Sequence, residues 1–226
     1  IDQLIFNAGD RVALVGAVVC GKSTLLKVLA GLYRPTEGRI QLGQADLWET
    51  DPAIVANHIG YLPQSVHLFK GTLRSNLLLA GATSDSQLLA VMEQLSIDTI
   101  VNSSPKGLDH EIYEGGDGLS GGQKQLVGLA RVALAQPTIW LLDEPTASLD
   151  NETERKVLEA IENSLKPNDI LILSTHRPLL ANRLAKRIIH MEAGRVAADG
   201  PAEQVLQGLM GKRRRTAPKG GANHAV

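Results

Sequence analysis

Cysteine, aromatic residues and long apolar runs are all scarce in this sequence of 226 residues. The one cysteine, Cys20, excludes an internal disulfide bond, and an aromatic content of 3% disfavours a stacking platform for single-stranded nucleic acid. No run approaches the roughly 18–20 apolar residues of a membrane-spanning helix, and Val12–Cys20 is the longest uncharged apolar run near the start. Ile1–Gly9 has no basic flank, so we expect no signal peptide. Because the chain begins with Ile, we expect it to be part of a longer protein.

Net charge is also small, at −1, but the charges are unevenly distributed. The last 15 residues hold five basic side chains and no acidic one, which leaves residues 1–211 with a net charge of −6. A body of this sign disfavours nucleic acid and anionic membranes, so we expect no nucleic acid partner. The end is rich in Gly, Ala and Pro, which predicts a disordered basic tail over 212–226. Its cluster Lys212–Arg215 has two interpretations, solubility or contact with a membrane surface.

Apolar runs that alternate with amphipathic stretches indicate an α/β fold with a largely parallel sheet. Strands are predicted at Arg11–Val15, Gly38–Leu42, Ile59–Leu62, Thr138–Leu142 and Asp169–Ser174, helices at Lys22–Leu32 and Glu152–Leu165, and a hairpin at Arg187–Met191 with Arg195–Ala198. The stretch 72–135 is rich in Leu, Ser and Gln, with helical patterns at Thr72–Leu79, Gln87–Leu95 and Gln123–Ala135. We therefore predict a core of residues 1–71 and 136–211 with a helical subdomain, 72–135, inserted into it.

The segment Gly16–Ser23 fits the pattern G-x-x-x-x-G-K-[ST] between a predicted strand and a predicted helix. In such a loop the backbone amides and the positive helix N-terminus surround phosphate groups. Lys22 would then reach the outer phosphates, and the Ser23 hydroxyl would bind Mg²⁺. The alternative, a tight turn without a ligand, does not require this combination of residues.

An acidic pair, Asp143 and Glu144, follows the apolar strand that begins at Thr138. The carboxyl ends of parallel strands are where open α/β sheets bind ligands. Beside a phosphate loop, Asp143 would hold Mg²⁺ and Glu144 would orient and deprotonate the attacking water. His176 ends the neighbouring apolar strand and is a candidate to bond the terminal phosphate, although a lone histidine is more often structural. The alternative for the acidic pair is an exposed loop without a role.

The segment Leu119–Gln123 combines a helix start with two glycines. Ser120 and Gln123 have the spacing of a capping box for the helix predicted after them. Gly121 and Gly122 leave the first amides uncovered, so an anion could dock there. A helix that required only a cap would not need two glycines at this point.

Together these segments resemble the nucleotide-binding domain of ABC transporters, and the resemblance covers almost the whole chain. It implies the P-loop NTPase (RecA-like) fold with an inserted helical subdomain. It identifies Gly16–Ser23 as the phosphate loop, Leu119–Gln123 as the signature, Thr138–Glu144 as the Walker B strand, His176 as the switch histidine, Gln64 as the Q-loop glutamine and Ser148–Asp150 as the D-loop. The segment Leu68–Thr72, with Asn76, is similar to the pattern that follows the Q-loop in exporters. Glu114–Gly118 resembles bacterial type I secretion exporters of proteins or peptides, as does Gly31–Gly38.

The resemblance implies ATP hydrolysis with Mg²⁺ by two copies arranged head to tail, coupled to export. ATP is expected to contact Gly16, Ala17, Val18, Val19, Cys20, Gly21, Lys22, Ser23 and Thr24 of one copy, and the signature residues Ser120, Gly121, Gly122 and Gln123, with Asp150, of the other. Mg²⁺ is expected at Ser23, Gln64 and Asp143, and the catalytic residues are expected to be Glu144, His176, Lys22 and Gln64. The implied partners are the exporter's transmembrane domains and a second copy, at the cytoplasmic face of the bacterial inner membrane.

Two features depart from the family pattern. Val19 stands where the family usually has Gly or another small residue, and a β-branched residue is costly if the backbone there needs a positive φ. The aromatic residue that stacks on adenine upstream of the first strand is expected to be missing. The alternatives to a transport ATPase are a soluble ABC ATPase, a P-loop kinase or GTPase, and a degenerate cassette that binds ATP without turnover.

Overall fold

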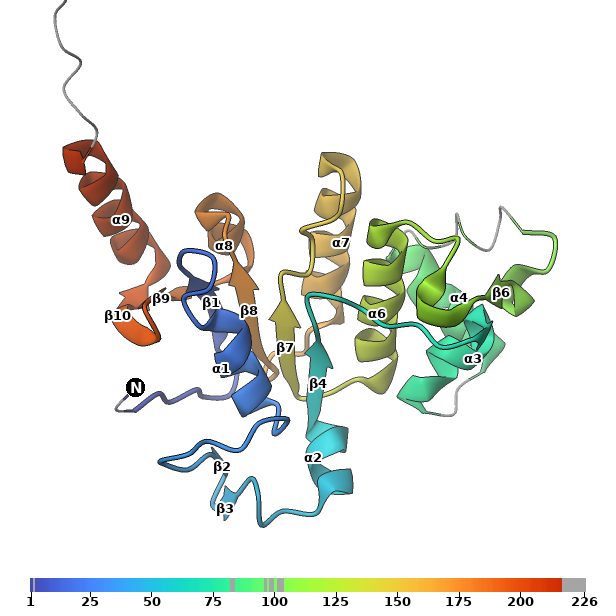
Figure 1. Ribbon diagram of the computed structural model, residues 1–226, viewed down its shortest axis with the longest axis horizontal. Helices are drawn as coiled ribbons and strands as arrows, with labels where there is room; N and C mark the ends of the chain where they lie inside the picture. The colour runs from blue at the N-terminus through green and yellow to red at the C-terminus, as the bar shows by residue number, and fades with distance from the viewer. Residues whose placement is uncertain (2, 82–83, 96, 98–99, 101–103, 217–226) are drawn as a thin grey trace, which may run out of the picture.

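A computed structural model describes the chain except for residues 2, 82–83, 96, 98–99, 101–103 and 217–226. Its centre is a six-stranded sheet in the order β10-β9-β1-β8-β7-β4 (Figure 1). All neighbours pair in parallel except β10 with β9. The strands are β1 Arg11–Val15, β4 Ile59–Leu62, β7 Ile139–Asp143, β8 Ile170–Thr175, β9 Arg187–Glu192 and β10 Arg195–Pro201. Because five strands run parallel, their carboxyl ends share one edge of the sheet.

Both faces of the sheet are covered, which explains why its central strands β1, β7 and β8 are largely apolar. Val12 and Leu14 of β1 point to one face, where they pack with Leu26 of α1 (Lys22–Leu29). Ala13 and Val15 alternate to the other face. That second face packs against α6 (Gly121–Ala135), α7 (Asn151–Ser164), α8 (Pro178–Leu184) and α9 (Ala202–Thr216). The predicted α/β class is confirmed, and the sheet is mixed because of β10.

The stretch 72–135 is mostly helical and lies beside the β4 edge of the sheet (Figure 1). Its helices are α3 Leu73–Leu77, α4 Asp85–Gln94 and α6, with short 3₁₀ turns η1 Leu78–Ala80, η2 Gly107–Asp109 and η3 Glu114–Gly116. α6 packs closely against β4, because a Cβ on Gly128 would lie 2.6 Å from a methyl group of Val66 and 2.9 Å from one of Leu62. The division into a core and an inserted subdomain stays a prediction.

Two small antiparallel pairs and one further helix complete the described elements. They are β2 Gln41–Leu42 with β3 Ala45–Asp46, β5 Gly71–Thr72 with β6 Glu111–Ile112, and α2 Pro52–His58. The strand predicted over Gly38–Leu42 is therefore shorter than expected. Helix α1 likewise ends at Leu29, before the positive φ of Gly31.

The chain end differs from the prediction of a disordered tail over 212–226. Helix α9 continues to Thr216, so residues 212–216 are helical. Lys and Arg are good helix formers, so the basic cluster does not end a helix that begins at Ala202. The rest of the predicted tail, 217–226, lies outside the described residues. None of the helices in the described part of the chain combines the length and apolarity needed to cross a membrane.

Candidate nucleotide site

The phosphate loop connects β1 to α1 and requires an unusual backbone. Gly16, Val19 and Gly21 have φ values of 154°, 66° and 104°. A Cβ on Gly16 would lie 2.3 Å from the Met191 carbonyl oxygen of β9, so only glycine fits there. The amide of Gly194, in the turn after β9, donates to the Cys20 carbonyl at 3.0 Å. The hairpin of β9 and β10 thus supports the loop from one side.

The loop presents backbone amides that have no hydrogen-bond acceptor in the described chain. Helix α1 begins at Lys22, and no side chain caps it. Within the described chain the amides of Gly21, Lys22 and Ser23 have no acceptor, which is the arrangement that binds phosphate at a helix N-terminus. The ammonium group of Lys22 is buried and donates to the carbonyl oxygens of Gly16 and Ala17 at 3.0 Å each. The positive charge expected at the phosphates therefore lies inside the loop.

The acidic pair lies two strands from the loop, at the carboxyl end of β7. Asp143 is buried, with 1% of its surface exposed, and its Oδ1 accepts a 2.5 Å hydrogen bond from the Ser174 hydroxyl of β8. The same hydroxyl accepts the Glu144 amide at 3.0 Å. Glu144 has a φ of 50°, a left-handed conformation that side chains other than glycine adopt rarely. One serine therefore orients both acidic residues.

Glu144 and His176 are in direct contact. The Nδ1 atom of His176 lies 2.8 Å from Oε2 of Glu144, and the two side chains are 49% and 13% exposed. Both line a small hollow with Pro145, Thr146, Ala147, Thr175 and Arg177. The structure thus brings together the expected base and the expected switch histidine. His176 contacts Glu144 here, whereas the sequence had suggested a bond to the terminal phosphate.

The oxygen donors suit Mg²⁺, which prefers hard oxygen ligands and usually keeps waters and substrate phosphates in its shell. Among the described residues, Oδ2 of Asp143 accepts no hydrogen bond and remains available. Ser23 is half-buried in the first turn of α1, and Gln64 is exposed in the loop that follows β4. The described chain contains no cluster of three or more His, Cys, Asp or Glu side chains able to hold a metal. The donor set therefore fits an ion that also relies on phosphate oxygens.

The signature segment forms the expected capping box. Ser120 Oγ accepts the Gln123 amide at 3.1 Å, and Gln123 Oε1 accepts the Ser120 amide at 2.8 Å. The two glycines are not equivalent, however. A Cβ on Gly122 would lie 2.9 Å from the Ser148 carbonyl oxygen, whereas one on Gly121 would be 3.8 Å from its nearest neighbours. Close packing within the chain thus explains why position 122 is glycine, whereas the sequence had suggested only a docking site for an anion.

The predicted D-loop residue Asp150 is engaged locally. Its carboxylate caps α7 by accepting the amides of Glu152 and Thr153 at 3.0 Å, and Thr153 Oγ1 donates to it at 2.7 Å. The Thr153 amide is the main cause of a pKa for Asp150 below its ordinary value. Asp150 therefore has a structural role in this chain, and a nucleotide contact stays a prediction.

Figure 1 shows the phosphate loop and the first turn of α6 at the same edge of the sheet, with β8 and β7 between them. One copy therefore does not close the signature over its own loop. Lys22, Ser23, Asp143, Glu144 and His176 are gathered at the carboxyl ends of β1, β7 and β8. The signature residues stand apart from them.

Comparison with known proteins agrees with this geometry. The family model described as "ABC transporter" matches residues 2–147. The chain belongs to the ABC transporter family. The type I secretion system ATP-binding protein PrsD of Rhizobium meliloti is 37% identical over 202 residues, which cover 88% of this chain and 34% of that protein. The lactococcin transport/processing ATP-binding protein LcnC-like of Lactococcus lactis is 35% identical over 206 residues, which cover 90% of this chain and 28% of that protein.

A solved structure shows the same fold. A bacterial Atm1-family ABC exporter with ATP bound matches with a TM-score of 0.84 and 30% identity, over 95% of this chain and 38% of that chain. The chain thus spans about a third of the length of the relatives it matches. It corresponds to their ATP-binding domain, and ABC transporter ATP-binding domains are ATPases.

Three residues of this ABC ATP-binding domain were missed by sequence reasoning. Ser174 orients the acidic pair, and Gln125 of α6 reaches the Glu144 carbonyl at 3.4 Å. Tyr61 of β4 has a buried hydroxyl close to the Asp143 end of the site. A polar residue at the end of the otherwise apolar strand β8 was the available signal for Ser174. No pattern in the sequence marks the other two.

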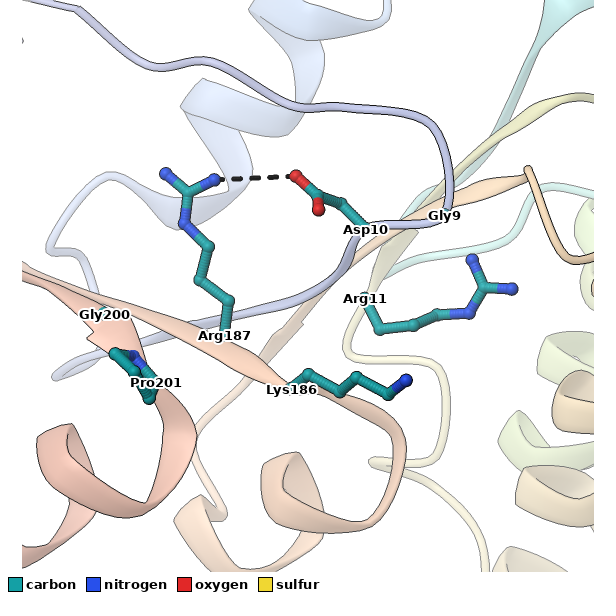
Figure 2. A pocket seen from close by; sticks show the side chains of 7 residues that line it. All are labelled: Gly9, Asp10, Arg11, Lys186, Arg187, Gly200 and Pro201. Carbon is teal, nitrogen blue, oxygen red and sulfur yellow. Dashed lines mark ion pairs between the residues drawn. The ribbon is translucent and has the colours of Figure 1, made fainter.

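A second hollow of the domain lies at the opposite edge of the sheet and is not the ATP site. Its volume is about 280 Å³, and its lining comes from Gly9, Asp10, Arg11, Lys186, Arg187, Gly200 and Pro201 (Figure 2). Arg187 is already paired with Asp199 and lies 3.6 Å from Asp10. Arg11 donates to the carbonyls of Asp169 and Lys166, and Figure 2 shows it pointing away from Arg187. These cations do not converge on a common ligand.

Upstream of β1, Phe6 is the aromatic residue nearest in sequence to the phosphate loop. It packs with the cluster between the sheet and α1, and the Arg187 guanidinium lies 5.6 Å from its ring centroid. Arg187 lines the hollow at the edge opposite the phosphate loop, so the ring that its guanidinium covers lies toward that edge.

Proposed function

We propose that this chain hydrolyses Mg²⁺-ATP as a head-to-tail pair and drives the export of proteins or peptides across the bacterial inner membrane by type I secretion. The observation that supports this most strongly is the joint placement of Lys22, Asp143, Glu144 and His176 at one sheet edge. The signature stands at the same edge but apart from them, which is the geometry that a second copy would complete (Figure 1).

In the proposed reaction, Glu144 accepts a proton from a water molecule as the water oxygen bonds to the γ-phosphorus. The bond from that phosphorus to the β,γ-bridging oxygen breaks, and ADP leaves with the electron pair. His176 holds the Glu144 carboxylate in place through the 2.8 Å contact. Lys22 and the amides at the start of α1 stabilise the negative charge on the phosphates. Mg²⁺, held by Ser23, Asp143 and Gln64, would neutralise further charge on the phosphate oxygens.

The second copy would supply its signature. The Ser120 end of α6 is exposed, and it stands apart from the phosphate loop of the same copy (Figure 1). Closing the two copies would place the positive helix end of each α6 on the phosphates bound by the other. Gly121, which packs loosely, would lie at this contact.

Coupling to transmembrane domains is supported by the link between α6 and the loop after Gln64. The Arg131 guanidinium of α6 donates to the His67 carbonyl at 3.0 Å, and to the carbonyl and Oδ1 of Asn76 at 2.9 and 2.6 Å. Phe69, in the same loop, is exposed. A membrane domain that docks on this loop would therefore move the signature helix with it. Type I secretion as the pathway is supported by the names of the relatives.

The decisive test is Glu144→Gln. We expect the variant to bind ATP and to lose turnover by about 10²–10⁴-fold, because it lacks the general base while keeping the side chain's shape. ATP binding is measured by calorimetry, and turnover by phosphate release. Glu152→Gln is the matched control, since Glu152 is exposed and pairs only with Lys156 at 3.1 Å. Wild-type turnover in Glu144→Gln would refute the assigned role.

A further inference from the structure

Tyr61 lies in the strand next to the one that carries Asp143, an expected Mg²⁺ ligand. It belongs to β4, in register with Leu141 of β7. Its ring packs in the cluster between the sheet and α1, together with Leu25 and Leu29. Asp143 is two residues after Leu141, so it points to the same face of the sheet. Tyr61 and Asp143 thus share the face that α1 covers.

The hydroxyl of Tyr61 is an exception in this protein. It is buried, and within the described part of the chain it is the one buried side-chain polar atom without a hydrogen-bond partner. Buried polar groups are nearly always bonded, because leaving one unpaired costs its full desolvation penalty. Burial, with a smaller contribution from the negative charge of Asp143, raises the pKa of Tyr61 to about 12. The group therefore remains a hydrogen-bond donor at physiological pH.

Asp143 carries an acceptor on the same face of the sheet, and no direct hydrogen bond joins it to the Tyr61 hydroxyl. Ser174 occupies Oδ1 of Asp143, and in the described chain Oδ2 accepts no hydrogen bond. An unpaired donor and an unpaired acceptor on one face, without a direct bond, are the pair that a single water molecule can bridge.

We propose that the Tyr61 hydroxyl donates to a water held between it and Oδ2 of Asp143, and so positions this carboxylate for the metal ion of bound nucleotide. Tyr61 is then a positioning residue, since it acts through Asp143. The inference rests on the proposed function, because it concerns the binding of Mg²⁺-ATP.

The test compares Tyr61→Phe with its parent, both carrying Glu144→Gln so that no ATP is consumed. Two dissociation constants are measured by calorimetry for each protein, one for ATP with excess Mg²⁺ and one for ATP in EDTA. We expect Tyr61→Phe to weaken Mg²⁺-ATP binding about 3- to 10-fold, the size of one hydrogen bond, and to leave ATP binding in EDTA unchanged. Tyr113→Phe is the matched control, as Tyr113 is exposed.

The outcomes separate the inference from the proposed function. Equal constants for Tyr61→Phe and its parent, or a loss of equal size with and without Mg²⁺, would overturn the role of Tyr61 while leaving the function intact. A parent that binds ATP no better with Mg²⁺ than in EDTA would overturn both.

Discussion

Val19 is the one residue of the phosphate loop other than glycine that has a left-handed backbone conformation. Its φ is 66°, and its side chain is 96% exposed, so packing does not compensate for the conformation. A left-handed residue that is not glycine costs on the order of 1–3 kcal/mol. The sequence suggested that the backbone at this position could need a positive φ, and the structure shows that it has one.

We expect Val19→Gly to tighten ATP binding by about 3- to 10-fold, because glycine adopts this conformation without strain and lets the backbone approach phosphate closely. Calorimetry of ATP binding is the measurement. Val18→Gly is the control: Val18 is also exposed but has no positive φ, so the substitution adds flexibility without relieving strain. An unchanged dissociation constant for Val19→Gly, or an equal gain for Val18→Gly, would contradict the prediction.

At the level of elements, the junction between α6 and the segment before α7 determines how the signature is presented. Gly122 lies against the Ser148 carbonyl, and Asp150 caps α7 just beyond it. The start of one helix therefore supports the start of the next. Gly122 is needed for this packing, whereas Gly121 has room around it and is free to face a phosphate, and the sequence pattern does not distinguish these two roles.

We expect Gly122→Ala to lower the free energy of unfolding by about 1–3 kcal/mol, since the new methyl group would lie 2.9 Å from the Ser148 oxygen and force the two segments apart. Gly121→Ala should leave stability unchanged or slightly higher, because its nearest neighbours are at ordinary contact distance and alanine favours the helix. Urea denaturation of both variants gives the comparison. Equal effects of the two substitutions would show that the close packing of Gly122 is not what limits this position.

At the level of the whole molecule, the separation of loop and signature along one sheet edge means that a complete site needs two copies. Strand order causes this separation, because β8 and β7 lie between β1 and the helical stretch (Figure 1). Changes to the two halves of the site should therefore complement each other between chains.

We expect Lys22→Ala and Ser120→Asp each to abolish turnover alone, and an equal mixture of the two to restore part of it. Aspartate still caps α6 but repels phosphate, so the fold is kept. In a mixed pair, one site combines an intact loop with an intact signature. Phosphate release is followed at several protein concentrations, and wild-type turnover should rise faster than linearly with concentration. A mixture as inactive as its components would exclude a shared site.

Much of the local structure was predictable from the sequence. The bounds of β1 and β4, the capping box at Ser120 and the acidic pair after β7 all follow from short-range patterns, and the structure confirms them. The helix α2 was not predicted, although Asp51 caps it and Pro52 begins it, because its pattern is short and none of its residues is buried. Helix α9 was not predicted either, and its residues 212–216 were expected to belong to a disordered tail because the chain end is rich in Gly, Ala and Pro.

The sequence by itself determined the chemistry of this protein: a loop that can bind phosphate, carboxylates at a strand end, and a capped helix start. Spacing along the chain is sufficient for these features, because each is built from neighbouring residues. Only the tertiary structure decided that Ser174 holds both acidic residues, that Tyr61 shares a face of the sheet with Asp143, and that the signature stands away from the loop. These facts depend on strand order and register, which bring residues from distant parts of the chain to one sheet edge.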